Sequence, residues 1–385
     1  MTSNAPPIKE MAQRLISTPS VSSTLAQFDQ SNLDVVHTLA NWLEPLGFQI
    51  DIIPIAGREG KANLIARRGT GHDGLVLSGH TDTVPFDAHL WASDPFTLTE
   101  QGDRWYGLGA CDMKSFFALV IAALEPLARK TFERPLVILA TADEESSMSG
   151  ARALTAAQME GAGFALIGEP TGLHPVVRHK GIMMLSVTVE GHSGHSSNPA
   201  LGKNALEGIG VVIAELGKFR DELRRKYRHP AFEVAWPTLN PGCISGGDNP
   251  NRICDHVLLE FDVRVLPGME NEVVRREIAA CLVPEVEALG MKCKVEPLHP
   301  PVPPFEATGD DLLKTALKAS GEEERSVAFA TEAPFLSQLG METIVLGPGS
   351  IDQAHQPNEY IELKQLEPTL GIIRALVKKY CLSGQ

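Results

Sequence analysis

The sequence is poor in cysteine and in positive charge, and it has no long hydrophobic run. Its six cysteines are scattered without a Cys-x-x-Cys pair, which argues against a disulfide framework or a thiolate zinc site. The 48 acidic residues outnumber the 34 lysines and arginines, giving a net charge of −14. That balance argues against nucleic acid and anionic membranes as partners. The longest apolar run, 116–124, is too short to span a bilayer.

Residues 1–7 also lack the apolar segment of a signal peptide, so we expect a cytoplasmic protein with reduced thiols. The length of 385 residues exceeds one typical domain, so two domains are expected. Before residue 181, short apolar strands alternate with amphipathic helices. This alternation is typical of an α/β sheet covered on both faces. The predicted strands are 48–53, 62–66, 74–77, 136–140 and 164–167, and the predicted helices are 8–16, 32–46, 114–125 and 149–160.

After Gly181 the pattern changes to β-α-β-β-α-β, the plan of a small two-layer module. Its predicted elements are strand 183–190, helix 204–226, strands 238–244 and 256–265, helix 269–289 and strand 291–295. The proline-rich stretch 299–304 is typical of a stiff linker, and helix 310–319, strand 342–346 and helix 364–380 follow. We predict a mixed-sheet, three-layer α/β domain of residues 1–181 and 297–385, interrupted by an inserted two-layer α+β domain of residues 182–296.

Polar residues gather where the predicted strands of the first domain end. His80 and Asp82 follow strand 74–77, Glu144 and Glu145 follow strand 136–140, and Glu169 follows strand 164–167. Ligands of open α/β sheets bind outside the carboxyl ends of the strands. Each of these residues has an ordinary explanation by itself, such as a surface-loop histidine, a helix N-terminus or a turn. Their joint occurrence at successive strand ends indicates a functional site.

Two further residues on adjoining loops complete a metal-binding pattern. Asp112 lies in a glycine-rich turn, and His355 follows strand 342–346. Nitrogen and oxygen ligands without thiolate suit two zinc ions, with cobalt or manganese as alternatives. Five ligands, one of them a bridging carboxylate, would be supplied by His80, Asp112, Glu145, Glu169 and His355. Glu144 is then available as a general base, and Asp82 is placed to orient His80.

These motifs resemble the dinuclear zinc aminoacylase/carboxypeptidase-type metallohydrolases over nearly the whole chain. The resemblance is carried by the segments 79–85, 142–145, 168–170, 194–197 and 354–357. It implies that His80, Asp112 and Glu169 hold one metal ion, while Glu145, His355 and the bridging Asp112 hold the other. It also implies that Glu144 shuttles the proton, that Asp82 supports His80, and that the peptide after Asp112 is cis.

The resemblance gives the inserted domain two roles, as a lid and as the contact between the subunits of a homodimer. His195 would then reach the partner subunit's active site and help to stabilise the oxyanion. From the residues alone, His195 is equally well a loop histidine near a helix start.

A narrower resemblance, to the family members that deacetylate N-acetylated amino acids, rests on segments 248–254, 331–335 and 347–357. The substrate would carry an α-carboxylate, for which the candidate contacts are Arg252, Arg264, Lys180 and Asn251, and a terminal ammonium, for which the candidate is Glu332. Arg264 and Glu332 are equally compatible with plain surface charges. The alternatives are succinyl-diaminopimelate desuccinylase activity, di- or tripeptidase activity and, disfavoured by the intact Glu144, a metal-binding module without turnover.

Overall fold

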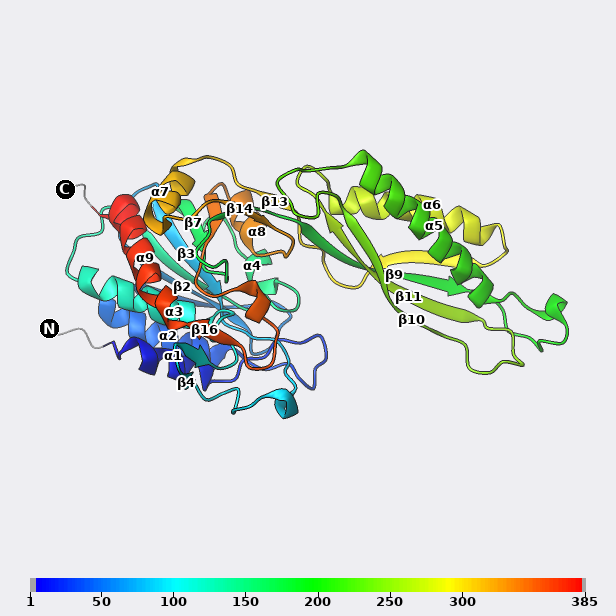
Figure 1. Ribbon diagram of the computed structural model, residues 1–385, viewed down its shortest axis with the longest axis horizontal. Helices are drawn as coiled ribbons and strands as arrows, with labels where there is room; N and C mark the ends of the chain where they lie inside the picture. Colours follow the sequence, from blue (N-terminus) through cyan, green and yellow to red (C-terminus); the bar gives the residue numbers. More distant parts are fainter. Residues whose placement is uncertain (1–4, 383–385) are drawn as a thin grey trace. The chain divides into compact units, whose positions relative to one another are not determined.

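A computed structural model describes residues 5–382, which form two compact units (Figure 1). Among the described residues, the first unit comprises 5–177, 307–325 and 331–382, and the second comprises Arg178–Glu306 and Ser326–Ala330. Each unit has a hydrophobic core of its own. In the described part of the chain, no helix is both long enough and apolar enough to cross a membrane.

The main sheet has the strand order β1-β2-β6-β3-β7-β15-β8-β13, with β14 paired to β8. β6, β3, β7 and β15 run parallel to one another, whereas the outer pairs are antiparallel. β3 and β6 are buried along their whole length, as expected for strands covered on both faces. The bounds are β1 Gln49–Pro54, β2 Ala62–Arg68, β3 Gly74–His80, β6 Leu136–Thr141, β7 Ala162–Ile167, β8 Val176–His179, β13 Phe305–Glu306, β14 Arg325–Val327 and β15 Glu342–Val345.

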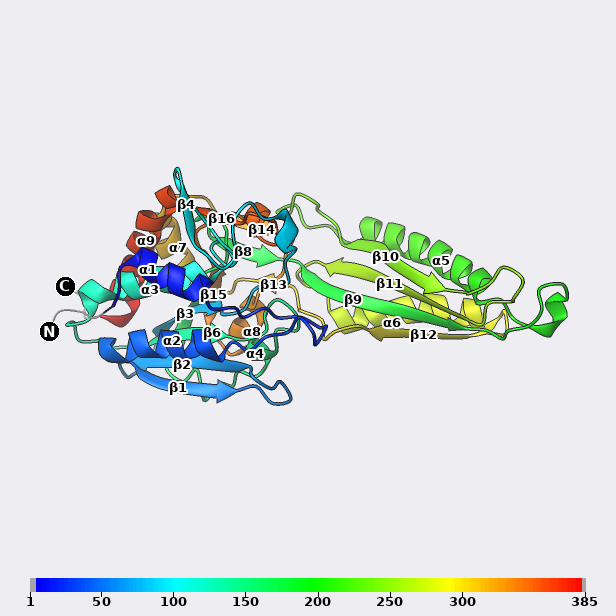
Figure 2. The ribbon, with the colours of Figure 1, turned by 90° about the horizontal axis from the view of Figure 1, so that it is seen from below.

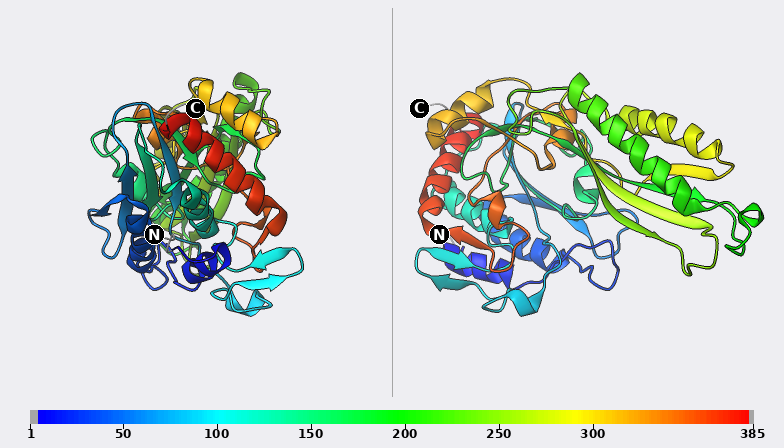
Figure 3. Two further views of the ribbon diagram at one scale, coloured as in Figure 1. Left: turned by 90° about the vertical axis from the view of Figure 1, so that its left-hand side faces the viewer. Right: turned by 45° about the vertical axis from the view of Figure 1, so that its right-hand side comes forward.

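Helices cover this sheet on two sides, which gives three layers (Figures 1 and 3). α3 and α9 pack against β3, whereas α8 packs against β7 and β15. On the α9 side, the rings of Tyr380 and Phe164 lie 4.2 Å apart between their centroids. The predicted mixed-sheet α/β class is therefore confirmed. The helix bounds are α1 Ile8–Ile16, α2 Leu33–Leu43, α3 Lys114–Leu124, α4 Ser149–Arg152, α7 Asp311–Ser320, α8 Ala333–Gln338 and α9 Leu366–Cys381.

A small second sheet of the first unit joins two segments that are far apart in the sequence. Its strands are β4 Thr99–Gln101, β5 Arg104–Tyr106 and β16 Tyr360–Glu362, in the order β16-β5-β4. The antiparallel pairing of β5 with β16 brings the glycine-rich turn after β5 beside the loop that precedes β16. These two segments carry Asp112 and His355.

The second unit follows the predicted β-α-β-β-α-β order. Its elements are β9 Gly181–Glu190, α5 Ala205–Lys226, β10 Thr238–Gly246, β11 His256–Val265, α6 Asn271–Glu287 and β12 Lys292–Pro297. The four strands pair antiparallel in the order β10-β11-β9-β12, side by side in Figure 2. Figure 1 shows α5 and α6 beside each other on one face of this sheet. Buried residues accordingly alternate with less buried ones along β11.

One sequence prediction about the elements is wrong. The helix predicted over 149–160 is shorter in the structure, where α4 ends at Arg152. The residues that follow form turns, in which polar side chains make hydrogen bonds with the backbone. The Gln158 side chain accepts from the Thr155 amide at 2.8 Å, and Arg67 donates to the Gln158 carbonyl at 2.7 Å. Within the proline-rich stretch 299–304, predicted as a stiff linker, Val302 and Ile182 exchange backbone hydrogen bonds of 2.9 and 3.0 Å.

Candidate metal centre

The parallel strands β3, β6 and β7 end at one edge of the main sheet, and each is followed by candidate ligands. His80 is the last residue of β3 and pairs in register with Thr141, the last residue of β6. Glu144 and Glu145 lie just beyond β6, and Glu169 lies two residues beyond β7. Parallel alignment of the strands therefore gathers one imidazole and three carboxylates.

Asp112 and His355 reach the same place from the two loops joined by β5 and β16. The peptide between Asp112 and Met113 is cis, in agreement with the resemblance. His355 has a left-handed backbone with φ of 59°. Its side chain is 54 % exposed, so the imidazole is placed mainly by the course of its loop.

The distances within this cluster divide it into overlapping groups. His80 Nε2 lies 2.9 Å from Asp112 Oδ1 and 3.9 Å from Glu169 Oε1. His355 Nε2 lies 2.9 Å from Glu145 Oε2 and 3.7 Å from Asp112 Oδ2. The two oxygens of Asp112 thus face the two imidazoles, one each.

The five predicted ligands and Glu144 are all brought together. Candidate ligand atoms within 4.8 Å of one another occur in the groups His80–Asp112–Glu169, Asp112–Glu145–His355 and His80–Glu144–Glu145. The third group includes Glu144, so the position of this carboxylate suits a metal ligand as well as a base.

Electrostatics at the centre favour bound cations. Burial, with repulsion from neighbouring carboxylates, raises the pKa of Glu144 and of Glu169 well above their usual range. Burial and the nearby Asp112 also raise the pKa of Glu145. Several carboxylates therefore share a site that disfavours their charged form, and positive charge placed among them would relieve that cost.

Carboxylates also surround the two imidazoles of the centre and favour their charged form. Burial opposes a charged His80, but the hydrogen bond to Asp112 and the nearby carboxylates raise its pKa well above the usual value. The bond to Glu145 raises the pKa of His355 to about 9. Glu169 Oε1 is buried without a hydrogen-bond partner. Imidazole and carboxylate donors with an unpartnered buried oxygen fit divalent metal ions.

Asp82 supports the centre through its carboxylate and its carbonyl. Asp82 Oδ2 accepts from the Glu145 amide at 3.1 Å, and Oδ1 accepts from the Glu144 amide at 3.3 Å. His80 Nδ1 lies 3.0 Å from the Asp82 carbonyl and 3.6 Å from its carboxylate. The fully buried Asp82 therefore contacts both His80 and the loop that carries the two glutamates.

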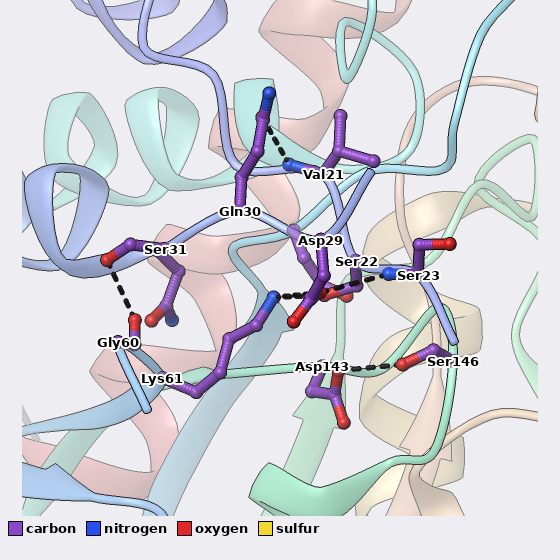
Figure 4. A network of polar contacts seen from close by, with 12 residues as sticks. Val21, Ser22, Ser23, Asp29, Gln30, Ser31, Gly60, Lys61, Asp143 and Ser146 are labelled. Carbon is purple, nitrogen blue, oxygen red and sulfur yellow. Dashed lines mark hydrogen bonds and ion pairs between the residues drawn. The ribbon is translucent and has the colours of Figure 1, made fainter. Parts of the chain in front are cut away.

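Asp143, which sequence reasoning passed over, is the anchor of that loop. It is buried and has a φ of 63°. Its carboxylate accepts from Arg58 at 2.5 Å, Ser146 at 2.7 Å and Ser149 at 2.8 Å, and also from Ser147; Figure 4 shows the Ser146 bond. Burial alone would raise the pKa of Asp143, but these hydrogen bonds together lower it. The clustered serines of 146–149 were the available signal.

Glu359, also missed, binds the turn that carries Asp112. Its carboxylate accepts from the backbone amides of Gly109, Cys111 and Asp112 at 3.1, 2.7 and 2.9 Å. Burial and the neighbouring Asp112 raise the pKa of Glu359 to about 8, although the three amides oppose that rise. In the sequence, Glu359 is indistinguishable from a surface glutamate at the start of a strand.

His195 lies on an exposed loop of the second unit, beside the segment 251–252. Its Nδ1 is 2.7 Å from Ser197 Oγ. His195 forms an isolated backbone bridge with Arg252, and the Asn251 carbonyl accepts from the Ser196 amide at 3.1 Å. The structure thus brings three predicted residues, His195, Asn251 and Arg252, onto two neighbouring loop segments of the second unit.

The charged substrate candidates already have contacts. Arg252 pairs with Asp248 at 2.7 Å, and Arg264 pairs with Asp262 at 2.9 Å. Lys180 donates to the Trp236 carbonyl at 2.7 Å, and burial, followed by repulsion from Arg264, lowers its pKa to about 8.

Glu332 lies in the first unit, at the N-terminal end of α8. It is 1 % exposed, its Oε1 has no hydrogen-bond partner, and burial raises its pKa to about 7. The expectation of a plain surface carboxylate is therefore wrong for Glu332. It is one of the charges that raise the pKa of Glu144 and Glu169, so it lies close to the centre.

Known proteins resemble the chain along its whole length. The model of peptidase family M20/M25/M40 matches residues 76–379. An acetylornithine deacetylase of Proteus mirabilis is 45 % identical over 384 residues, which cover 100 % of this chain and 99 % of the relative. A tripeptidase of Staphylococcus aureus has a similar structure, with a TM-score of 0.76, 19 % identity and 99 % coverage of each chain. A dinuclear metal-binding peptidase of Bacillus subtilis gives a TM-score of 0.67 at 16 % identity, with 97 % of each chain covered.

Proposed function

The chain belongs to peptidase family M20/M25/M40, and from this premise we propose that it hydrolyses N2-acetyl-L-ornithine to L-ornithine and acetate. The observation that carries the proposal is the convergence of His80, Asp112, Glu145, Glu169 and His355 around Glu144. Full-length similarity to an acetylornithine deacetylase supports the choice of acyl group and amino acid.

We propose that the centre holds two zinc ions, with cobalt as a possible substitute. His80, Asp112 and Glu169 would hold one ion, and Asp112, Glu145 and His355 the other. The two-sided contacts of Asp112, 2.9 Å to His80 and 3.7 Å to His355, support its role as the bridging ligand. When bound, such ions polarise the amide carbonyl and lower the pKa of water.

The protein's own residues then move the proton and hold the substrate. Glu144 would accept the proton of the attacking water and return it to the leaving amine, which releases acetate. Asp82 keeps Glu144 in place through the 3.3 Å bond to its amide. His195, supplied by the partner subunit of a homodimer, would donate to the oxyanion as the amide carbonyl becomes tetrahedral.

The two ends of the substrate call for opposite charges. We assign the terminal ammonium to Glu332, because its buried Oε1 lacks a partner. The α-carboxylate would be bound by residues of the second unit. Among Arg252, Arg264, Lys180 and Asn251, Arg252 is favoured by its place beside His195.

The homodimer proposal is supported by the edge of the second unit. β10 is the terminal strand of the four-stranded sheet and pairs only with β11 in the described chain. Exposed apolar side chains lie along it and on the adjacent α5, including Ile244 at 52 % and Leu206 at 49 %. An unpaired strand edge with apolar side chains suits pairing with a second copy.

A biosynthetic place in the cytoplasm fits the proposed reaction, since deacetylation of acetylornithine releases ornithine for arginine biosynthesis. All six cysteines are free thiols in the structure. Desuccinylation of succinyl-diaminopimelate and cleavage of short peptides are the competing activities, and the assays below include both.

The test of the assigned base is the substitution Glu144→Gln. We expect the variant to bind zinc like the wild type while kcat falls by about 10²–10⁴-fold, since a positioned base contributes that much. Equilibrium dialysis with zinc analysis measures the first quantity, and steady-state hydrolysis of acetylornithine the second. Loss of bound zinc would make Glu144 a ligand instead, and an unchanged kcat would remove it from the mechanism.

A further inference from the structure

The buried carboxylate of Glu359 connects the loops that carry Asp112 and His355. It is 1 % exposed and lies four residues after His355. Its oxygens accept hydrogen bonds from three backbone amides of one loop, those of Gly109, Cys111 and Asp112, at 2.7 to 3.1 Å. Hydrogen bonds to a buried carboxylate are among the stronger ones in proteins.

The backbone of Glu359 adds a fourth link between the same loops. Its carbonyl accepts from the Gly107 amide at 3.0 Å. The pairing continues directly into the β5–β16 ladder, in which Tyr106 lies opposite Tyr360. One residue thus fixes the whole turn 107–112 against the segment that leads back to His355.

The two candidate metal groups depend on this link to different degrees. Besides the shared Asp112, the first group uses His80 and Glu169, which follow the adjacent parallel strands β3 and β7. The second group uses His355, whose half-exposed side chain relies on its loop. The distance between His355 and Asp112 therefore depends on the hydrogen bonds by which Glu359 joins the two loops.

We propose that Glu359 is a positioning residue that fixes His355 relative to Asp112 and thereby sets the affinity of the Asp112–Glu145–His355 metal site. The inference rests on the dinuclear centre of the proposed function. Groups that orient metal ligands from behind typically change metal affinity by about 10–100-fold when they are replaced.

Glu359→Gln is the informative variant because it preserves size while altering the hydrogen bonds. The amide oxygen can still accept from Cys111 and Asp112, but the NH₂ group would face the Gly109 amide, donor against donor. The matched control is Glu362→Gln at the end of β16, three residues further on, where the side chain is 27 % exposed and pairs with Lys364 at 2.9 Å. Glu359→Asp keeps the carboxyl group and shortens the side chain.

Zinc titration of the metal-free proteins by calorimetry tests the proposal, with circular dichroism and thermal unfolding of each protein before zinc is added. We expect wild type and Glu362→Gln to bind two equivalents. Glu359→Gln should keep the first equivalent, lose about 10–100-fold in affinity for the second, and remain folded. Glu359→Asp should lie between it and the wild type.

Three outcomes would overturn the inference: equal weakening of both equivalents, unchanged binding of both, or loss of the fold in Glu359→Gln. Equal weakening of both equivalents, or loss of the fold, would mean that the Glu359 carboxylate stabilises the whole first unit and not one metal site in particular. Binding of fewer than two equivalents by the wild type is a different result, since it would contradict the dinuclear centre itself.

Discussion

At the scale of single residues, the centre depends on buried groups that hold its loops in place. Asp82, Asp143 and Glu359 are buried carboxylates that accept hydrogen bonds from loop backbone or loop side chains. They hold in place the loops that present Glu144, Glu145 and Asp112. A metal site needs its ligands fixed before the ion arrives, because loose ligands lose conformational entropy on binding.

Replacing Asp143 by alanine should disorder the loop that carries Glu144 and Glu145. Four side-chain donors lose their acceptor, and Arg58 loses its ion pair at 2.5 Å. We expect kcat/KM to fall by about 10–100-fold, as for other residues that orient metal ligands. Ser146→Ala removes one donor and is the control, with a loss of less than threefold. Equal activity of Asp143→Ala and wild type would contradict this role.

His179 predicts a pH dependence of stability that is independent of catalysis. Burial lowers its pKa to about 4, while an unfolded histidine titrates near 6.5. The unfolded chain therefore binds the proton first, so stability is complete above about pH 6.5 and declines as the pH falls toward 4. This difference between the folded and unfolded pKa of His179 corresponds to about 3 kcal/mol in the free energy of unfolding.

The measurement is the free energy of unfolding of wild type and His179→Gln between pH 7 and pH 4. The difference between the two proteins should shrink by about 3 kcal/mol over this range, since only the wild type loses the histidine contribution. Parallel curves would show that His179 does not titrate as its burial implies.

At the scale of elements, the strands of the main sheet could be predicted from the sequence, but the contacts that hold the loops and turns between them could not. Apolar runs predicted β3, β6 and β7 to within a few residues, and polar residues at the strand ends predicted the candidate ligands that the fold brings together. Glu359 and Asp143 were missed because their partners are backbone amides and serines of other segments, which one sequence does not reveal. The helix over 149–160 was wrong because Arg67, from another strand, stabilises turns that the local pattern does not indicate.

The C-terminal helix α9 is expected to contribute strongly to the stability of the first unit. Tyr380 is 2 % exposed, packs on Phe164 and donates to Asp311 at 2.8 Å. Tyr380→Ala should cost about 3–5 kcal/mol through the cavity that it leaves, whereas Tyr380→Phe should cost about 1 kcal/mol for the lost hydrogen bond. Chemical denaturation measures both variants, and similar costs for the two would mean that ring packing is not the main term.

At the scale of the whole molecule, the proposed role of His195 as an oxyanion donor in the partner subunit requires two copies of the chain for activity. Ile244→Arg in β10 together with Leu206→Arg in α5 would place charges on the exposed apolar edge. We expect sedimentation to change from dimer to monomer and kcat to fall by about 10²-fold, since each active site would lose the partner's oxyanion donor.

The control for the dimer is Val273→Arg on α6, where the native side chain is also exposed, at 37 %. It adds the same charge to the second unit away from β10 and should leave a fully active dimer. A monomeric double variant that retains wild-type kcat would contradict the role given to His195, and a wild type that sediments as a monomer would contradict the dimer.

If the protein deacetylates N2-acetyl-L-ornithine at a metal centre, values of kcat/KM should rank this substrate above its competitors. The zinc- or cobalt-reconstituted enzyme would be assayed with acetylornithine, succinyl-diaminopimelate, other N-acyl amino acids and di- and tripeptides. The account predicts that acetylornithine has the highest kcat/KM, by at least about tenfold, a difference of about 1.4 kcal/mol in transition-state binding. A higher kcat/KM for a succinylated substrate or a peptide would contradict it.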